Sequence, residues 1–202
     1  MIRLGLDFDN TLISYDALFK KVALEQGLIP EAIAANKNAV RDYLRSEHRE
    51  DDWTRLQGEV YGNRILDATP YPGMKKALEY FSKREVPLAI VSHKTKTPFL
   101  GEPWDLHAAA RHWLEKEDMH SKLGPNIDRS NTFFELTKEA KRDRIVSLRC
   151  THYVDDLPEI LAMLPASITK IYFSPETYPD KKEEDWLVMS SWDQLTSFIM
   201  MP

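Results

Sequence analysis

The sequence contains little cysteine and no long apolar run. Cys150 is the only cysteine among 202 residues, so no disulfide can form within the chain, and we expect a reducing compartment. No apolar stretch approaches the roughly 20 residues that a membrane-spanning helix needs. Asp7 and Asp9 interrupt the only apolar segment near the N-terminus, so no secretion signal is predicted. These features favour a cytoplasmic protein with no membrane partner.

The chain also lacks an excess of positive charge. It has 27 Lys and Arg residues against 32 Asp and Glu residues, which gives a net charge of −5 at pH 7. Proteins that bind nucleic acid usually present a basic surface, so we expect no nucleic-acid partner. A length of 202 residues is enough for one core domain with a small insertion. The composition leaves the oligomeric state open.

What the sequence does contain is an alternation of short apolar segments and helical patterns. The expected strands are 2–6, 86–92, 132–134, 152–154 and 168–173. The expected helices between and after them are 74–84, 105–116, 139–149 and 192–199. This order predicts an α/β fold with a Rossmann-like parallel sheet of about five strands flanked by helices. The charged run 181–185 predicts a solvated loop.

The stretch from Ser14 to Thr69 has a purely helical character. A first helix is expected to end at Gly27, which suits a C-terminal cap. A second helix is expected to begin near Pro30, because proline is favoured in the first helical turn. Asp51 or Asp52 is expected to cap a third helix. The stretch therefore predicts a small helical insertion after the first strand.

The turn-forming run 69–73 marks the end of this insertion. The predicted domain organisation is thus an α/β core domain formed by residues 1–13 and 70–202. The helical insertion, residues 14–69, is the second predicted domain.

Polar side chains follow three of the predicted strands at the points where the strands end. Asp7 and Asp9 follow the first strand, Ser92 ends the second, and Asp155 and Asp156 follow the fourth. The carboxyl ends of parallel strands open onto one edge of the sheet, where ligands bind. Residues far apart in the sequence are therefore expected to meet in one crevice.

The first of these acidic motifs has its own geometric logic. In an extended strand, residues two apart point the same way and lie about 6.5–7 Å apart, so Asp7 and Asp9 would flank a space of phosphoryl size, while Phe8 enters the core. Together with Asp155 and Asp156, four carboxylates would repel one another unless a cation lay among them. An all-oxygen site suits Mg²⁺. No cysteine and histidine cluster has the spacing of a zinc site.

These residues resemble the motifs of the haloacid dehalogenase (HAD) superfamily. Asp7-Phe8-Asp9-Asn10-Thr11 resembles the first motif, and Val91-Ser92 resembles the second. Lys141 resembles the lysine of the third motif, with Lys138 as its competitor, and Val154-Asp155-Asp156 resembles the acidic fourth motif. The resemblance covers essentially the whole chain, and the helical insertion lies where the family places its C1 cap.

The resemblance implies a HAD-like hydrolase, a phosphoric monoester phosphatase that forms an aspartyl-phosphate. Asp7 would be the nucleophile, and Asp9 would act first as general acid and then as general base. The Mg²⁺ ligands would be the Asp7 carboxylate, the Asp9 carbonyl and Asp156. Asp155 would hold a metal-bound water, although the two adjacent acids could exchange these roles.

The resemblance also assigns residues to the phosphoryl group. Ser92 and Thr11 would orient its oxygens or the acids, with help from the loop that contains Asn10. His93 follows Ser92 directly and could line the substrate path. Lys141 would offset the negative charge that collects between the nucleophile and the phosphoryl group.

Three other functions compete with a phosphatase. A dehalogenase is disfavoured, because dehalogenases resemble this motif without the second aspartate, here Asp9. A phosphomutase acting on a sugar phosphate uses the same acids, and the sequence does not separate it from a phosphatase. A phospho-aspartate receiver domain is disfavoured, because receivers place their paired acids first and the phosphorylated aspartate later. A C1 cap favours a small phosphorylated metabolite as the substrate, but nothing in the sequence identifies it.

Overall fold

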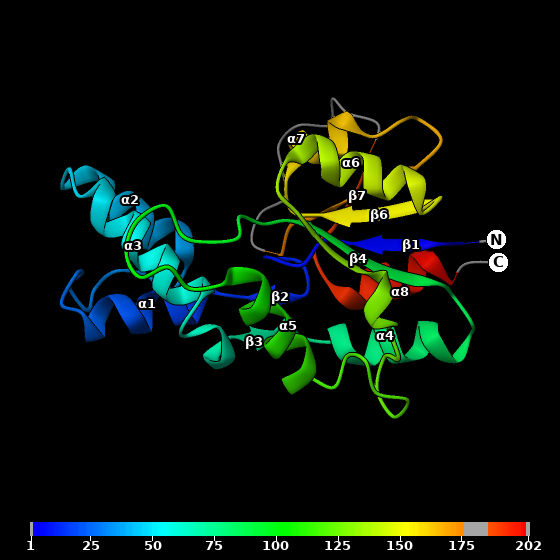
Figure 1. The fold of residues 1–202 in the computed structure, drawn as a ribbon, viewed down its shortest axis with the longest axis horizontal. Helices are drawn as coiled ribbons and strands as arrows, with labels where there is room; N and C mark the ends of the chain where they lie inside the picture. Colours follow the sequence, from blue (N-terminus) through cyan, green and yellow to red (C-terminus); the bar gives the residue numbers. More distant parts are fainter. Residues whose placement is uncertain (1, 176–185, 201–202) are drawn as a thin grey trace. The chain divides into compact units, whose positions relative to one another are not determined.

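The computed structural model describes residues 2–175 and 186–200 (Figure 1). The chain divides into two compact units. The first consists of Met1–Ile13, Pro70–His93 and Asp118–Pro202, and the second of Ser14–Thr69 and Lys94–Glu117. The second unit thus contains more than the predicted insertion, since Lys94–Glu117 was expected in the core domain. The predicted loop at 181–185 lies outside the described residues.

A parallel six-stranded sheet forms the centre of the first unit. Its strand order is β5-β4-β1-β6-β7-β8. The strands are β1 (Leu4–Leu6), β4 (Leu88–His93), β5 (Thr132–Glu135), β6 (His152–Asp155), β7 (Thr169–Phe173) and β8 (Trp186–Met189). Every strand pair is parallel, which confirms the Rossmann-like α/β class. The sixth strand, β8, was not predicted.

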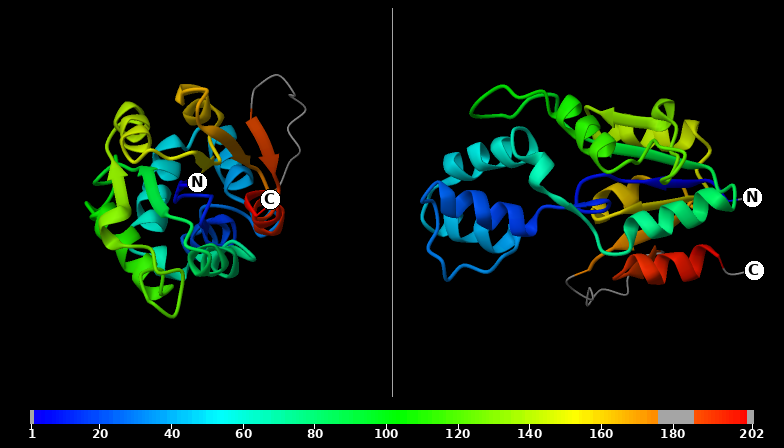
Figure 2. Two further views of the ribbon diagram at one scale, coloured as in Figure 1. Left: turned by 90° about the vertical axis from the view of Figure 1, so that its right-hand side faces the viewer. Right: turned by 90° about the horizontal axis from the view of Figure 1, so that it is seen from below.

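Helices cover both faces of this sheet (Figure 1, Figure 2). The helices α6 (Lys138–Ser147) and α7 (Pro158–Met163) lie together on one face, against β4, β5, β6 and β7. The helices α4 (Met74–Lys83) and α8 (Trp192–Ile199) lie together on the other face. The short helix α7 was not predicted, although Pro158 occupies its first turn, where proline is tolerated.

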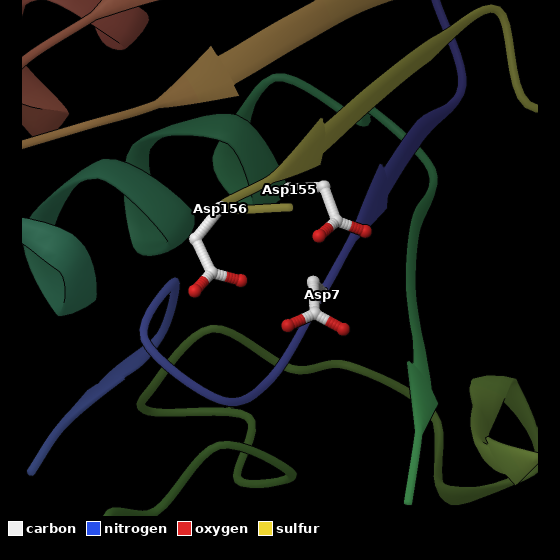
Figure 3. A group of neighbouring side chains, drawn as sticks. All are labelled: Asp7, Asp155 and Asp156. Carbon is white, nitrogen blue, oxygen red and sulfur yellow. The ribbon is translucent and has the colours of Figure 1, made fainter. Parts of the chain in front are cut away.

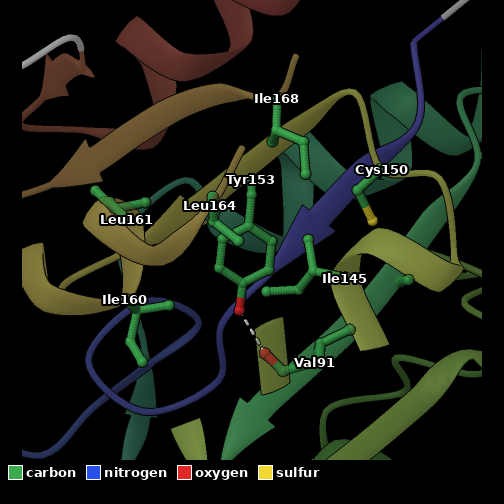
Figure 4. Close-up of a cluster of buried hydrophobic side chains, with 9 residues drawn as sticks. Val91, Ile145, Cys150, Tyr153, Ile160, Leu161, Leu164 and Ile168 are labelled. Carbon is green, nitrogen blue, oxygen red and sulfur yellow. Dashed lines mark hydrogen bonds between the residues drawn. The ribbon is translucent and has the colours of Figure 1, made fainter. Parts of the chain in front are cut away.

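Tyr153 lies at the centre of the apolar core between the sheet and α6 and α7 (Figure 4). Its ring is fully buried, and its hydroxyl group donates a hydrogen bond to the carbonyl oxygen of Val91. Gly5 on the neighbouring strand leaves room for the ring, since a Cβ atom there would lie 2.7 Å from Tyr153 Cδ2 and 2.9 Å from Cys150 Sγ. The free thiol of Cys150 is buried, and burial raises its pKa to about 11, so it packs as an apolar residue.

Three mutually packed helices form most of the second unit. They are α1 (Asp16–Glu25), α2 (Lys37–Ser46) and α3 (Glu50–Tyr61). The expected start of the second helix near Pro30 was wrong. The helix begins at Lys37 because Asn36 caps it, with its side-chain oxygen accepting a hydrogen bond from the Ala39 amide at 2.7 Å. Asp51 and Asp52 lie in the first turn of α3 rather than at its cap.

The segment Lys94–Glu117 joins the second unit through α5 (Leu106–Lys116) and the loop before it. The helix packs against α3 and a short 3-10 turn, η1 (Ile65–Asp67). The buried indole N–H of Trp113 donates a hydrogen bond to the Ala68 carbonyl at 3.0 Å. This partner of Trp113 could not be predicted from the sequence.

Two further strands, β2 (Ile13–Ser14) and β3 (Thr69–Pro70), pair with each other where the chain passes between the units. Within the described ranges, none of the helices combines the length and apolar character that a bilayer crossing requires.

Candidate active site

The register of the sheet brings Asp7 and Asp155 side by side. Leu6 at the end of β1 pairs with Val154 in β6, and the Asp7 amide donates a hydrogen bond to the Val154 carbonyl at 2.9 Å. The next residue of each strand is therefore an aspartate, and Asp156 follows directly. Oxygen atoms from the three carboxylates lie within 4.8 Å of one another, and Figure 3 shows the side chains directed toward a shared space. The predicted convergence of these three acids is what the structure shows.

Asp155 points toward the face of the sheet that α6 covers, because side chains along a strand alternate between the two faces. Tyr153 and Asp155 lie two residues apart on β6, so their side chains leave the sheet on the same side, and Tyr153 packs under α6 and α7. From α6, Lys141 extends its ammonium group to the acids. Its Nζ atom lies 2.6 Å from Asp7 Oδ1 and 2.7 Å from Asp155 Oδ2. The Tyr153 ring centroid lies 5.7 Å from the same atom.

Lys141, and not Lys138, occupies the carboxylate cluster. The side chain of Lys141 is 1% exposed and contacts two of the three acids. Lys138 stands at the start of α6 and pairs with exposed Glu159 at 3.1 Å. The two lysines are three residues apart, but only one points from the helix into the sheet edge.

Burial and mutual repulsion shift the pKa values of the acids. Burial raises the pKa of Asp155 to about 7, with a smaller increase from Asp7, although Lys141 and the Leu157 amide act in the opposite direction. Burial also raises the pKa of Asp7 above its usual range, opposed by Lys141 and aided by Asp9. Burial by itself would lower the pKa of Lys141, but the two carboxylates outweigh it and raise the pKa. Lys141 therefore stays an ammonium ion at neutral pH.

No protein-family model matches the sequence, and no curated protein matches it either. Solved structures do resemble it. A predicted phosphatase from Clostridium acetobutylicum has a TM-score of 0.61 and 14% identity over 98% of each chain. A HAD family hydrolase from Deinococcus radiodurans R1, with bound phosphate and sodium, has a TM-score of 0.59 and 14% identity over 98% of this chain and 94% of that chain. A dehalogenase has a TM-score of 0.61 and 11% identity over 100% of this chain and 98% of that chain.

The chain has the HAD fold. At these identities the likeness concerns the fold alone, and the chemistry has to be argued from the residues.

In this HAD fold the first motif does not continue β1 as an extended strand. The strand ends at Leu6, and Asp9 forms an isolated bridge with Ile13 beyond it. Asn10 adopts a left-handed conformation with φ of 55°, which turns the chain. The strand spacing assumed for Asp7 and Asp9 therefore does not describe this loop. Asp9 is near enough for its charge to raise the pKa of Asp7, and Phe8 enters the core as expected.

The remaining predicted residues lie around this loop. The Ser92 hydroxyl group, at the end of β4, hydrogen-bonds the Asp7 carboxylate and so lowers its pKa. The Asn10 side-chain amide donates to Asp156 Oδ2 at 3.0 Å, which ties the first loop to the fourth motif. Thr11 is buried, and its hydroxyl oxygen has no hydrogen-bond partner among the described residues. His93 ends β4 in a half-buried position, and its part in substrate binding stays a prediction.

Two contributors to the HAD-fold site were missed from the sequence. The Leu157 amide donates to Asp155 Oδ1 at 2.9 Å, so both oxygens of Asp155 are engaged by the protein. Tyr153 places an aromatic ring beneath Lys141 and was assigned to the strand alone. Its role could have been predicted from its position two residues before Asp155, because side chains two apart on a strand lie on the same face of the sheet. A hydrogen bond donated by a backbone amide, such as that of Leu157, cannot be predicted from the types of the residues.

Proposed function

We propose that this protein is a HAD-superfamily phosphatase that hydrolyses a small-molecule phosphomonoester through an aspartyl-phosphate on Asp7. The observation that carries the proposal is the buried bridge from Lys141 to Asp7 and Asp155. An ammonium ion held between a strand-end carboxylate and its neighbour is suited to offset the charge that develops when a phosphoryl group is transferred to that carboxylate.

The residues present fit a magnesium ion. The candidate ligands offer only oxygen atoms, and those of Asp7, Asp155 and Asp156 approach one another within 4.8 Å. Both Asp155 oxygens already accept hydrogen bonds, while Asp156 is only half-buried, which favours Asp156 as the direct ligand and Asp155 as its support. When bound, Mg²⁺ would supply positive charge that keeps the acids ionised and polarises the phosphoryl oxygens.

In the first step the Asp7 carboxylate attacks phosphorus. A new bond forms between the carboxylate oxygen and phosphorus, and the bond from phosphorus to the leaving oxygen breaks. Asp9, as the neutral acid, gives its proton to that leaving oxygen, which departs as an alcohol.

In the second step the Asp9 carboxylate takes a proton from water, and the water oxygen attacks phosphorus. The bond to Asp7 breaks, which restores the Asp7 carboxylate and releases inorganic phosphate. Lys141 and Ser92 hold the Asp7 carboxylate in one orientation throughout, since each hydrogen-bonds it.

Asp9 also supports phosphate ester hydrolysis over dehalogenation. A halide ion leaves without needing a proton, whereas an alkoxide leaving group does need one. Similar folds include a dehalogenase, so the fold does not separate the two reactions. The presence of Asp9 supports the ester reaction, because only that reaction uses an acid to protonate the leaving group.

We assign the helical second unit the role of a C1-type cap that selects a small phosphorylated metabolite. The support is its position in the chain, between the first and later motifs of the core. The same acids would serve a phosphomutase, so phosphate release without a bisphosphate activator is the discriminating result.

The decisive experiment measures phosphate release from a panel of sugar phosphates, nucleotides and glycerol phosphates, with Mg²⁺ or with EDTA. We expect Mg²⁺-dependent release by the wild type and a loss of roughly a thousandfold or more in Asp7→Asn. Asp143→Asn is the matched control, since Asp143 is exposed on α6 and, among the residues that the structure describes, pairs with neighbouring Arg142. Chloride release from haloacids without any phosphate release, or equal activity in Asp7→Asn, would overturn the proposal.

A further inference from the structure

Tyr153 contacts several of the elements that carry the candidate active site. It lies on β6, two residues before Asp155, and its ring centroid is 5.7 Å from Lys141 Nζ. A Cβ atom at Gly5, two residues before Asp7, would lie 2.7 Å from Tyr153 Cδ2, so the ring packs directly against the backbone of β1. The ring is therefore held between β1 and α6, and the direction of its hydroxyl group is held with it.

The Tyr153 hydroxyl group reaches past β1 to β4. It donates a hydrogen bond to the Val91 carbonyl oxygen, as Figure 4 shows. Because the strand order is β4-β1-β6, this bond joins the two strands on either side of the strand that leads into Asp7. The register of β1 and β4 ends at Ile90, so Val91 is the next residue of β4. Tyr153 thus holds β4 at the point where its pairing with β1 has ended.

The carbonyl group of Val91 belongs to the same peptide group as the Ser92 amide. Because a peptide group is planar and rigid, fixing its carbonyl oxygen restricts the backbone of Ser92 and hence the direction of the Ser92 side chain. Ser92 is buried and hydrogen-bonds the Asp7 carboxylate. Tyr153 is therefore connected to Asp7 through Val91 and Ser92.

A phenylalanine would fill the space around the Tyr153 ring without adding a polar atom. The neighbouring side chains in the core are apolar, among them Ile145, Ile160 and Leu164. Burying a hydroxyl group costs free energy unless the group forms a hydrogen bond. The bond that it forms here restrains the strand end that carries Ser92, which is a contribution that a phenylalanine could not make.

We propose that Tyr153 is a positioning residue that keeps the Ser92 hydroxyl group on the Asp7 carboxylate during phosphoryl transfer. The inference rests on the proposed function, in which Asp7 is the nucleophile. Because Tyr153 is 0% exposed, it does not contact the substrate. Its loss should therefore lower the rate of transfer rather than the affinity for the substrate.

Tyr153→Phe removes one oxygen atom and keeps the ring. With the best substrate of the phosphate ester panel, we expect kcat to fall about 10- to 100-fold and KM to change less than about threefold. The same substitution in Ser92→Ala protein should lower kcat less than about threefold, because the residue through which Tyr153 acts is already gone. An equal loss in both backgrounds would overturn the inference. Tyr153→Met, whose flexible side chain can fill the space without a hydroxyl group, gives the same comparison if Tyr153→Phe does not fold.

Ile168→Ala is the matched core control. Ile168 is buried in the same apolar cluster, and Figure 4 shows it at the opposite end of that cluster from Val91. It directly precedes β7, whose first residue pairs with His152 at the start of β6. We expect it to lower Tm at least as much as Tyr153→Phe, while kcat, measured well below unfolding, stays within about threefold of the wild type. A loss of kcat as large as that of Tyr153→Phe would overturn the inference, because core packing would then explain both.

Thermal unfolding in EDTA separates this inference from the proposed function. In the metal-free protein, the double variant Tyr153→Phe/Ser92→Ala should unfold at least about 2 °C above the temperature that the two single shifts predict when added. If no phosphate ester is hydrolysed but this difference in Tm is found, the phosphatase fails and the coupling of Tyr153 to Ser92 stands. Additive shifts would overturn the inference whether or not the protein is a phosphatase.

Discussion

Replacing Lys141 by methionine should destabilise the metal-free protein strongly and in a way that depends on pH. Methionine keeps much of the side-chain length but removes the ammonium group between Asp7 and Asp155. Both contacts are charge-assisted hydrogen bonds, at 2.6 and 2.7 Å, and the lysine is 1% exposed. Removing one partner of a buried ion pair typically costs about 3–5 kcal/mol, because the remaining charge is buried without compensation.

For a protein of this size, 1 kcal/mol corresponds to about 2–4 °C in Tm, so we expect Lys141→Met to unfold about 6–20 °C below the wild type at pH 8. At pH 5 the loss should be smaller. Without the lysine, which lowers both pKa values, Asp7 and Asp155 gain still higher pKa values and become neutral at that pH. The variant thus loses stability as the pH rises through those values.

The assay is thermal unfolding in EDTA at both pH values, with Lys138→Met as the matched control. Lys138 forms an exposed pair with Glu159, and such pairs contribute about 0–1 kcal/mol. Its variant should therefore stay near the wild type at either pH. A Lys141→Met protein that unfolds within about 2 °C of the wild type at pH 8, or that loses as much at pH 5 as at pH 8, would refute the reasoning.

Two further outcomes test the site and the core beneath it. The folded-state pKa of Asp155 is raised from 3.8 to about 7, so its contribution to stability is present below pH 3.8 and is lost as the pH rises through 7. Urea unfolding in EDTA should therefore find Asp155→Asn close to the wild type at pH 4 and more stable than it at pH 8; the reverse order at pH 8 would contradict the assigned shift. Gly5→Ala places a methyl group 2.7 Å from the buried Tyr153 ring, and we expect a loss of about 1–3 kcal/mol in the same assay; an unchanged free energy of unfolding would show that the ring can move.

Much of the core fold could be predicted because the physical signal is local. The strands of the sheet interior are short apolar runs bounded by polar residues, and alternation with helices leaves few topologies. The edge strand β8 gave a weaker signal. Its residues are partly exposed, and one of them, Leu187, is 39% exposed, so the run does not read as a buried strand.

The structure places Lys141, and not Lys138, at the carboxylates. Of the apolar residues Ile145, Val146 and Leu148, which follow Lys141 in the sequence, not all pack against the sheet. In the structure Ile145 is buried and Val146 is 46% exposed. The useful relation is the helical spacing of four residues between Lys141 and Ile145, which puts both on the face against the sheet.

The features that could not be predicted from the sequence depend on long-range packing. The segment Lys94–Glu117 was assigned to the core from its place after a core strand, yet it packs with the helical unit through Trp113 and Ala68. The unit to which this segment belongs depends on the long-range contacts of the Trp113 indole. A periodic pattern of apolar residues does not indicate those contacts. The burial of Lys94 is of the same kind, since a charged residue in a loop is usually solvated.

The charge balance of the site links its stability to its proposed chemistry. When ionised, Asp7, Asp155 and Asp156 carry three negative charges, and Lys141 carries one positive charge. In the metal-free protein the remaining repulsion, together with burial, raises the pKa values of Asp7 and Asp155. A divalent cation carries the charge that would remove this imbalance, and it would do so with oxygen ligands alone. Lys141 by itself therefore offsets only one of the three negative charges. The net negative charge that is left suits a phosphoryl-transfer site that depends on a bound cation.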